Sequence, residues 1–256
     1  MQGLADLIGI LNSQIWLYFI VFLRVGAAVS LLPGINESQI PMQIKLGAAV
    51  AFTFVVFPAV PDIDLRPDFG AAVLVLATEV LAGVVLGLGI RMFVLALQTA
   101  GAIAAQATSL SQILGGAVAE PVAAIGQILT VGGIALAILL GLHVKFAQLV
   151  IFSYTILQPG AFVFGSDLAE WGVDQVATAF SLAFSLAAPF VILSVLYNLA
   201  LGAINKAMPQ LMVAFVGAPV ITAGGLILLM LASPIMLTFW IMSFDLFLAD
   251  PFGARR

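Results

Sequence analysis

The stretch "YNLALGAINKAMPQLMVAFVGAPV", Tyr197–Val220, decides how the rest of the chain is interpreted. Most of it is as apolar as a lipid-facing helix, yet prolines and amides interrupt it. Pro209 cannot donate a backbone hydrogen bond and biases Met208 out of a helix, so "NKAMPQ" predicts a break at 205–210. Two apolar helices joined by such a polar turn would form a helical hairpin. Pro219 predicts a second break within the second helix.

The polar groups of this hairpin need surroundings other than lipid, because polar side chains are costly in hydrocarbon. Asn198 lies two helical turns before Asn205, so both amides occupy one face of the first helix. We expect them at the tip of the hairpin or against a protein partner. The predicted subunit-packing hairpin is marked by Asn198, Asn205, Lys206, Pro209, Gln210 and Pro219.

The composition of the whole chain agrees with a membrane location. The 256 residues are 63% hydrophobic and 8% charged, whereas soluble domains are about 25% charged. The net charge of -4 argues against a nucleic-acid partner. With no cysteine and one histidine, thiolate and multi-histidine metal sites are excluded, and we predict no metal or cofactor. The sequence therefore predicts an all-α integral membrane protein with lipid around it.

About six apolar stretches are long enough to cross a bilayer, which takes about 20 residues. Several are longer than that, and we expect these to be kinked or to form helical hairpins. Proline, glycine and acidic residues between the stretches predict polar turns at 31–41, 57–69 and 158–174. The stretches cover approximately 4–32, 43–60, 69–106, 122–158, 175–205 and 211–248.

The segment "AQATSLSQILGGAVAEP", residues 105–121, differs from the other breaks because it is apolar. Gly115 and Gly116 each disfavour a helix by about 1 kcal/mol relative to alanine. Ile113 and Leu114 would be unfavourable in water, and a non-helical backbone would be unfavourable in lipid. Such a segment persists at membrane depth only where protein encloses it or where it lines a water-filled cavity.

Charged residues interrupt the apolar runs at Arg24, Glu79 and Arg91. A charge at the bilayer centre costs at least about 2.5 kcal/mol, so each needs a partner or a place at the end of its span. Glu79 and Arg91 are about 18 Å apart along one helix and do not pair with each other. A structural ion pair, a headgroup contact and a proton relay all remain open for these three residues.

Gly83 and Gly87 form a G-x-x-x-G motif, which lets two helix backbones approach closely in a membrane. Packing inside the chain and packing against another subunit are both compatible with this motif. The sequence contains no P-loop, HExxH motif or nucleophile elbow, and its acidic residues are scattered. We therefore do not expect an enzyme.

Three blocks of the sequence resemble the FliR family of flagellar type III export-gate proteins and their injectisome relatives. They are "NLALGAINKAMPQLMVAFVGAPV" from Asn198, "RVGAAVSLLPGINESQIPMQIKLGAAVAFTFVVFPAVP" from Arg24, and "EVLAGVVLGLGIRMFVLALQTAGAIAAQATSLS" from Glu79. The resemblance covers nearly the whole chain in the same order. The first block favours a flagellar over an injectisome protein. In the second block the matching residues are Arg24, Pro33, Ile40, Pro41, Lys45, Leu46 and Gly47.

The resemblance implies a non-enzymatic subunit of a channel for unfolded export substrates in the bacterial inner membrane, at the flagellar basal body. It implies assembly with FliP- and FliQ-like subunits, and contact with FlhB- and FlhA-like export components. Residues 1–160 would correspond to a FliP-like part and 161–256 to a FliQ-like part. The family's channel plug would fall on Leu110, Ile113, Leu114, Gly115 and Gly116, where relatives often carry phenylalanines.

Two other functions remain as alternatives. A stand-alone secondary transporter would also use broken helices and buried charges, although the two halves show no convincing pair of matching broken segments. A scaffold of a secretion machine without channel contact would show the same composition. Co-purifying proteins, solute flux in vesicles and substrate crosslinking would distinguish these functions.

Overall fold

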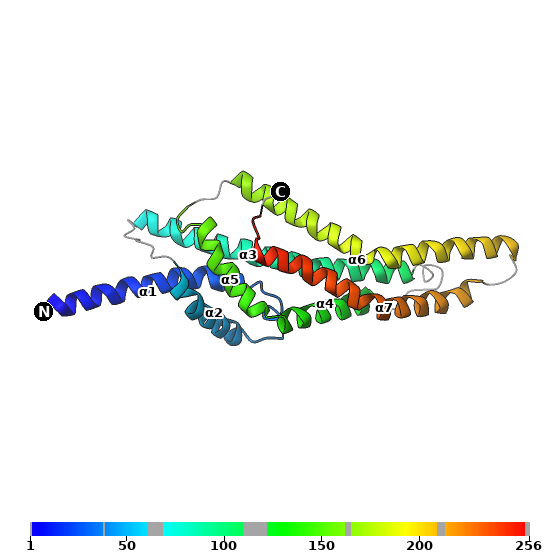
Figure 1. Ribbon diagram of the computed structural model, residues 1–256, viewed down its shortest axis with the longest axis horizontal. Helices are drawn as coiled ribbons and strands as arrows, with labels where there is room; N and C mark the ends of the chain where they lie inside the picture. The colour runs from blue at the N-terminus through cyan, green and yellow to red at the C-terminus, as the bar shows by residue number, and fades with distance from the viewer. Residues whose placement is uncertain are drawn as a thin grey trace. The chain divides into compact units, whose positions relative to one another are not determined.

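The structure is a computed structural model that describes residues 2–37, 39–60, 69–109, 122–161, 165–208 and 213–253. All regular structure in these residues is helical, which confirms the predicted all-α class (Figure 1). The helices are α1 (Gln2–Val29), α2 (Met42–Val56), the short 3-10 helix η1 (Phe57–Ala59), α3 (Phe69–Ser109), α4 (Val122–Leu139), α5 (Leu142–Ile156), α6 (Gly165–Ala207) and α7 (Val213–Ala249).

Among the described residues, four helices are long and apolar enough to cross a membrane, and a bent pair raises the number to five. The pair is Ile125–Leu139 and Leu142–Ile156, with a break between them. Gly141 lies at the bend with a φ of 82°, a left-handed conformation that glycine adopts without a steric penalty. The apolar stretch predicted at 122–158 is therefore two helices separated by a break, which fits a broken span or a re-entrant loop.

The predicted helix breaks agree with the structure at some positions and not at others. α1 ends at Val29 and α2 begins at Met42, as the predicted turn at 31–41 requires. The polar turn predicted at 158–174 is wrong beyond residue 164, because α6 already begins at Gly165. Asp167 lies in the first turn of α6, where a carboxylate is favoured by the helix dipole.

The second break predicted in the hairpin is also wrong, because α7 continues through Pro219. A proline removes one hydrogen bond from a helix, and in an apolar span the remaining hydrogen bonds of this 37-residue helix favour its continuation. By contrast, α6 ends at Ala207, two residues before Pro209. Pro209 and Gln210 lie outside the described residues.

The chain forms two compact units that alternate along the sequence. Unit 1 comprises Met1–Arg91, Leu140–Val173 and Asp245–Arg256. Unit 2 comprises Met92–Leu139 and Asp174–Phe244. The family resemblance predicts a division at residue 160 into a FliP-like and a FliQ-like part. This division concerns likeness to other subunits, which the two compact units do not test, and it stays a prediction.

Unit 1 is held together by aromatic contacts and by a close crossing of α1 with α3. Tyr18 of α1 stacks on Phe57 of η1 with ring centroids 3.5 Å apart. Phe52 of α2 meets Phe146 of α5 edge to face at 5.1 Å. Gly83 of α3 leaves no room for a side chain, because a Cβ atom there would collide with the Arg24 carbonyl oxygen.

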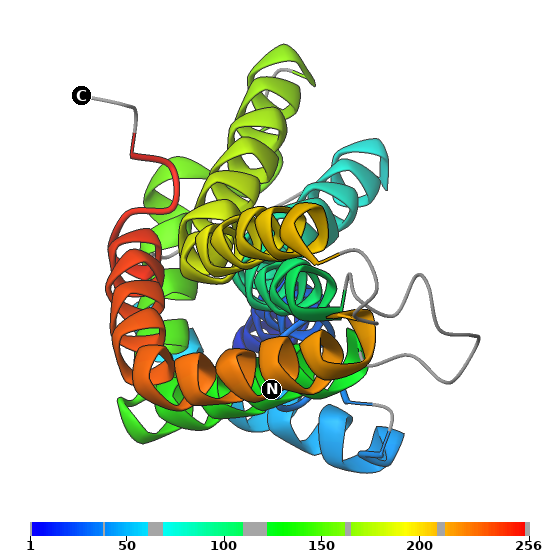
Figure 2. The same ribbon diagram turned by 90° about the vertical axis from the view of Figure 1, so that its right-hand side faces the viewer.

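Unit 2 is built on α4 and on the parts of α3, α6 and α7 that belong to it. α4 lies alongside α7, and a Cβ atom on Gly132 would lie 3.4 Å from Leu237 Cδ1 (Figure 2). Trp240 of α7 is buried, and its indole Nε1 donates a hydrogen bond of 2.9 Å to the Phe93 carbonyl. Gly101 of α3 crosses α4 so closely that a Cβ atom would collide with the backbone of Gly126.

Candidate functional site

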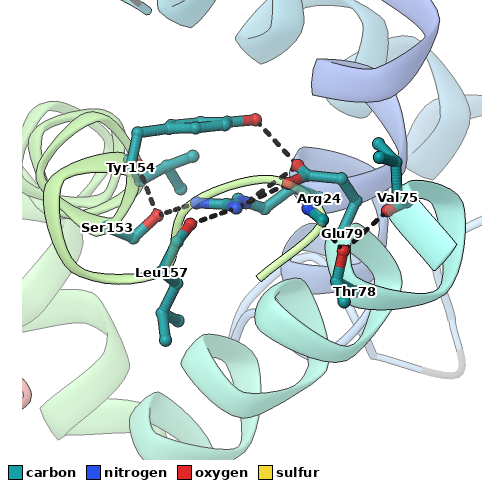
Figure 3. Close-up of polar contacts among 9 residues, drawn as sticks. Arg24, Val75, Thr78, Glu79, Ser153, Tyr154 and Leu157 are labelled. Carbon is teal, nitrogen blue, oxygen red and sulfur yellow. Dashed lines mark hydrogen bonds and ion pairs between the residues drawn. The ribbon is translucent and has the colours of Figure 1, made fainter. Parts of the chain in front are cut away.

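A buried polar cluster in unit 1 joins three helices around Arg24 (Figure 3). Arg24 on α1 has 1% of its surface exposed, and Glu79 on α3 has none. Two parallel hydrogen bonds connect them, from Nε to Oε2 at 2.9 Å and from Nη2 to Oε1 at 2.6 Å. This bidentate geometry is the strongest arrangement of a guanidinium with a carboxylate.

The third helix of the cluster is α5. Arg24 donates hydrogen bonds from Nη1 to Ser153 Oγ at 2.9 Å and from Nη2 to the Leu157 carbonyl at 2.7 Å. The Tyr154 hydroxyl donates to Glu79 Oε2 at 3.1 Å, and its ring lies 3.7 Å from the guanidinium carbon. Both charges are therefore paired and hydrogen-bonded, as groups at such depth require.

Local sequence explains why Arg24 and Glu79 meet. Glu79, Gly83 and Gly87 follow one another at intervals of four residues, so they lie on one face of α3. A Cβ atom on Gly83 would lie 2.7 Å from the Ala27 Cβ of α1, and one on Gly87 would lie 2.8 Å from the Leu31 Cβ, two residues after the end of α1. The two glycines therefore let the backbone of α1 approach α3, and Arg24 reaches the carboxylate one turn away.

The segment after α5 is tied to the same place. Gly160, with a φ of 76°, donates its backbone N–H to Thr78 Oγ1 at 3.0 Å. Thr78 precedes Glu79 on α3, and its hydroxyl donates to the Val75 carbonyl at 2.9 Å. The cluster thus fixes both the end of α5 and the chain that leads into α6.

The three predicted intramembrane charges have different surroundings. Arg24 and Glu79 pair with each other, a pairing that the sequence left open. Arg91 is exposed on α3. Sequence reasoning missed Ser153, Tyr154 and the Leu157 carbonyl, because hydroxyl groups and a backbone oxygen in an apolar run give no distinctive signal. In the sequence, the four-residue spacing of Glu79, Gly83 and Gly87 indicated that they share one side of α3. The structure shows that this side faces α1.

Within unit 2, α6 and α7 pack as antiparallel helices on either side of the predicted turn (Figure 1). A Cβ atom on Gly224 would lie 3.9 Å from Leu193, and one on Gly217 would lie 3.4 Å from Leu201. Moving forward along α6 therefore means moving backward along α7. The Tyr197 hydroxyl lies against Gly217.

The end of α6 carries polar residues on its exposed surface. Asn198, Asn205 and Lys206 are exposed, and Asn198 Nδ2 donates to Ser194 Oγ at 3.3 Å. Pro219 is exposed on α7. The predicted plug residues Leu110, Ile113, Leu114, Gly115 and Gly116 lie outside the described residues.

A second ion pair in unit 1 is more accessible than the first. Lys145 Nζ on α5 and Asp245 Oδ1 on α7 are 2.7 Å apart, with side chains 31% and 40% exposed. Close to the end of α7, Trp171 Nε1 donates to the Pro251 carbonyl at 2.8 Å. In the part of the chain that the structure describes, no group of three or more histidine or acidic residues is arranged to hold a metal ion.

Comparison with known proteins places this architecture in a family. Residues 15–247 match the family described as bacterial export proteins, family 1. The chain is 34% identical to the flagellar biosynthetic protein FliR of Caulobacter vibrioides, over 86% of this chain and 89% of the relative. It is 30% identical to FliR of Escherichia coli, over 89% of this chain and 88% of the relative.

A more distant relative, FliR of Bacillus subtilis, is 25% identical over 86% of both chains. The family match covers the buried cluster and both helices of the hairpin. Long apolar helices and these relatives together indicate an integral membrane protein of flagellar export. The chain belongs to the FliR family of bacterial export proteins.

Proposed function

We propose that this chain is a wall-forming subunit of the flagellar type III export gate in the bacterial inner membrane. It would assemble with FliP- and FliQ-like subunits and pass unfolded substrates through a shared channel. The observation that carries this proposal is the length of α6. Its 43 residues span about 64 Å at 1.5 Å per residue, about twice the 30 Å hydrocarbon core of a bilayer.

The exposed surface of α6 makes this length significant. Exposed apolar side chains extend along it from Val176 (41% exposed) through Ile192 (60%) to Ile204 (45%), a contour of about 42 Å at 1.5 Å per residue. Where this stretch runs along the bilayer normal, a hydrocarbon core of about 30 Å leaves part of it uncovered, and water is unfavourable for such side chains. Helices of other subunits would cover the apolar side chains of α6 that lipid does not reach. This is expected of a chain whose apolar surface is fully buried only inside an assembly.

The α6–α7 hairpin is the proposed packing surface for neighbouring subunits. Asn198 and Asn205 are exposed two turns apart on one face of α6, where a neighbouring helix could accept or donate hydrogen bonds. In lipid these amides would be unfavourable. We include Lys206, Pro209, Gln210 and Pro219 in this surface, as the sequence predicts, and we assign residues 1–160 and 161–256 to FliP-like and FliQ-like parts.

The segment between α3 and α4 is the proposed plug of the channel. It holds Leu110, Ile113 and Leu114, followed by Gly115 and Gly116. Apolar constrictions can close a pore by excluding water, so aliphatic side chains could replace the phenylalanines of relatives. FlhB- and FlhA-like components would supply the coupling to energy, because the sequence has no nucleotide-binding motif. In this role the chain would not be an enzyme.

A stand-alone secondary transporter is the second candidate, and the broken α4–α5 span favours it. Two helices separated by a break at Gly141 inside one apolar stretch resemble the discontinuous helices of transporters. In that case the chain would work alone or with copies of itself. Its substrate would be a small solute, whereas the export gate passes unfolded protein.

Affinity purification from the native membrane tests the proposal. The chain would carry a C-terminal tag, be solubilised in mild detergent and be purified beside an untagged control. FliP- and FliQ-like proteins in one large complex are the expected result. A chain that purifies alone, or only with itself, would contradict the gate proposal, and solute flux into reconstituted vesicles would then test the transporter.

A further inference from the structure

Beside the Arg24 cluster, unit 1 has a small, partly open hollow that the cluster does not fill, and its lining includes the exposed residues Gln158 and Ala161. Its volume is about 20 Å³, and it lies between α3, the segment after α5 and the first turns of α6. Its lining includes the polar residues Arg24, Thr78 and Gln158. Its apolar lining includes Ala82, Val85 and Leu168.

One N–H group of the Arg24 guanidinium is not used in the hydrogen bonds of the cluster. A guanidinium has five N–H groups. Arg24 uses four of them on Glu79, Ser153 and the Leu157 carbonyl. The second N–H of Nη1 has no hydrogen-bond partner among the described residues, although the Arg24 side chain is only 1% exposed. A buried donor without an acceptor is unfavourable, so a further partner for this N–H would stabilise the cluster.

Thr78 supplies the complementary group. Its hydroxyl donates to the Val75 carbonyl and accepts one hydrogen bond from the Gly160 backbone. A hydroxyl oxygen can accept two hydrogen bonds, so one lone pair is still available. The residues that line the hollow therefore include Arg24 of α1, with an unused donor, and Thr78 of α3, with an unused acceptor.

We infer that this hollow is a binding site for one water molecule. A volume of 10–15 Å³ is about the minimum that holds a water, and a buried water needs two to four polar partners. Arg24 would donate to it, and the water would donate to Thr78 and to the Gln158 side-chain amide. Glu79 already neutralises the guanidinium, so the chemistry selects a neutral ligand over an anion.

This water completes the hydrogen bonding of the cluster. It links α1, α3 and the segment after α5 beside the Arg24–Glu79 pair. The site does not depend on the export role, because it uses only residues of unit 1 of this chain. It would persist whether the protein works in a gate or alone.

An experimental map of the purified protein tests the inference directly. The resolution must be high enough to show other water molecules in the protein interior. The expected result is one isolated peak within hydrogen-bond distance of an Arg24 Nη atom in the hollow. An empty hollow in such a map would overturn the inference, as would a partner side chain or a detergent chain that occupies the space.

Two variants on α3 provide a matched comparison. Ala82→Val adds two methyl groups to the lining of the hollow, and the peak should disappear while the Arg24–Glu79 pair remains. Ala77→Val makes the same change at an exposed position of the helix and should keep the peak. Persistence of the peak in Ala82→Val would contradict the site, and failure of that variant to fold would leave the parent map to decide.

A crystal grown in bromide separates water from an anion. Bromide scatters anomalously, so an anomalous peak in the hollow would show that a halide binds beside Arg24. That result would overturn the assignment of water. A normal peak without anomalous signal is the expected outcome.

Discussion

Arg24 and Glu79 lie 55 residues apart in sequence, yet their charged groups meet at 2.6 Å with 1% and 0% of their side chains exposed. Removing one partner of a buried pair leaves an uncompensated charge, which costs about 3–5 kcal/mol. Replacing both partners with apolar residues removes that penalty. The pair therefore predicts strong non-additivity between two substitutions.

We expect Arg24→Leu and Glu79→Leu each to lower the thermal unfolding midpoint strongly in mild detergent. Each single change should cost about 3–5 kcal/mol, and the double variant should cost clearly less than the sum. Scanning fluorimetry of the purified variants measures the midpoints. Additive effects of the two changes would show that the side chains do not interact in the folded protein.

The crossing of α1 with α3 predicts that Gly83 tolerates no side chain. In Gly83→Ala the new methyl group would lie 2.7 Å from the Ala27 Cβ, so α1 would have to move away from the Glu79 carboxylate. We expect a loss of about 1–3 kcal/mol, as for other overpacked helix contacts. The measurement is the same unfolding midpoint.

Gly47→Ala is the matched control, because nothing lies within 4 Å of a Cβ atom at this exposed position in α2. Alanine is favoured over glycine inside a helix, so this change should raise stability by about 0.5–1 kcal/mol. If both variants behaved alike, steric closeness at Gly83 would not be the cause of its effect.

The Lys145–Asp245 pair predicts a much smaller effect than the buried pair. Its side chains are 31% and 40% exposed, and accessible pairs contribute about 0–1 kcal/mol because solvent and salt screen them. We expect Asp245→Asn to shift the unfolding midpoint little, and less still in high salt. A loss comparable to that of Glu79→Leu would mean that this pair is buried in the functional assembly.

The proposed plug predicts a leak without a loss of assembly. Deletion of Gln112–Ala117 removes Ile113, Leu114, Gly115 and Gly116 from the segment between α3 and α4. Cells that carry the deletion should take up or release small ions that the parent retains, because the apolar barrier to water would be shortened. Co-purification of partners serves as the assembly control, and a variant as tight as the parent would contradict the plug assignment.

Some features of the fold follow from local sequence alone. Hydropathy and proline positions predicted the membrane class and the break between α1 and α2, because both depend on a few neighbouring residues. The turn predicted at 158–174 failed because acids and glycines are also compatible with the first turns of a helix. Trp171 in that helix finds its partner, the Pro251 carbonyl, only 80 residues later in the chain.

Local sequence does not reveal which residue pairs with a buried charge. The sequence determined that Arg24 and Glu79 would be costly in an apolar protein, since that cost is a property of each residue and its neighbours. Only the tertiary structure decided that they pair, and that Ser153, 129 residues from Arg24, completes the cluster. Hydrogen bonds act over about 3 Å, and only the crossing of α1, α3 and α5 brings distant residues within that range.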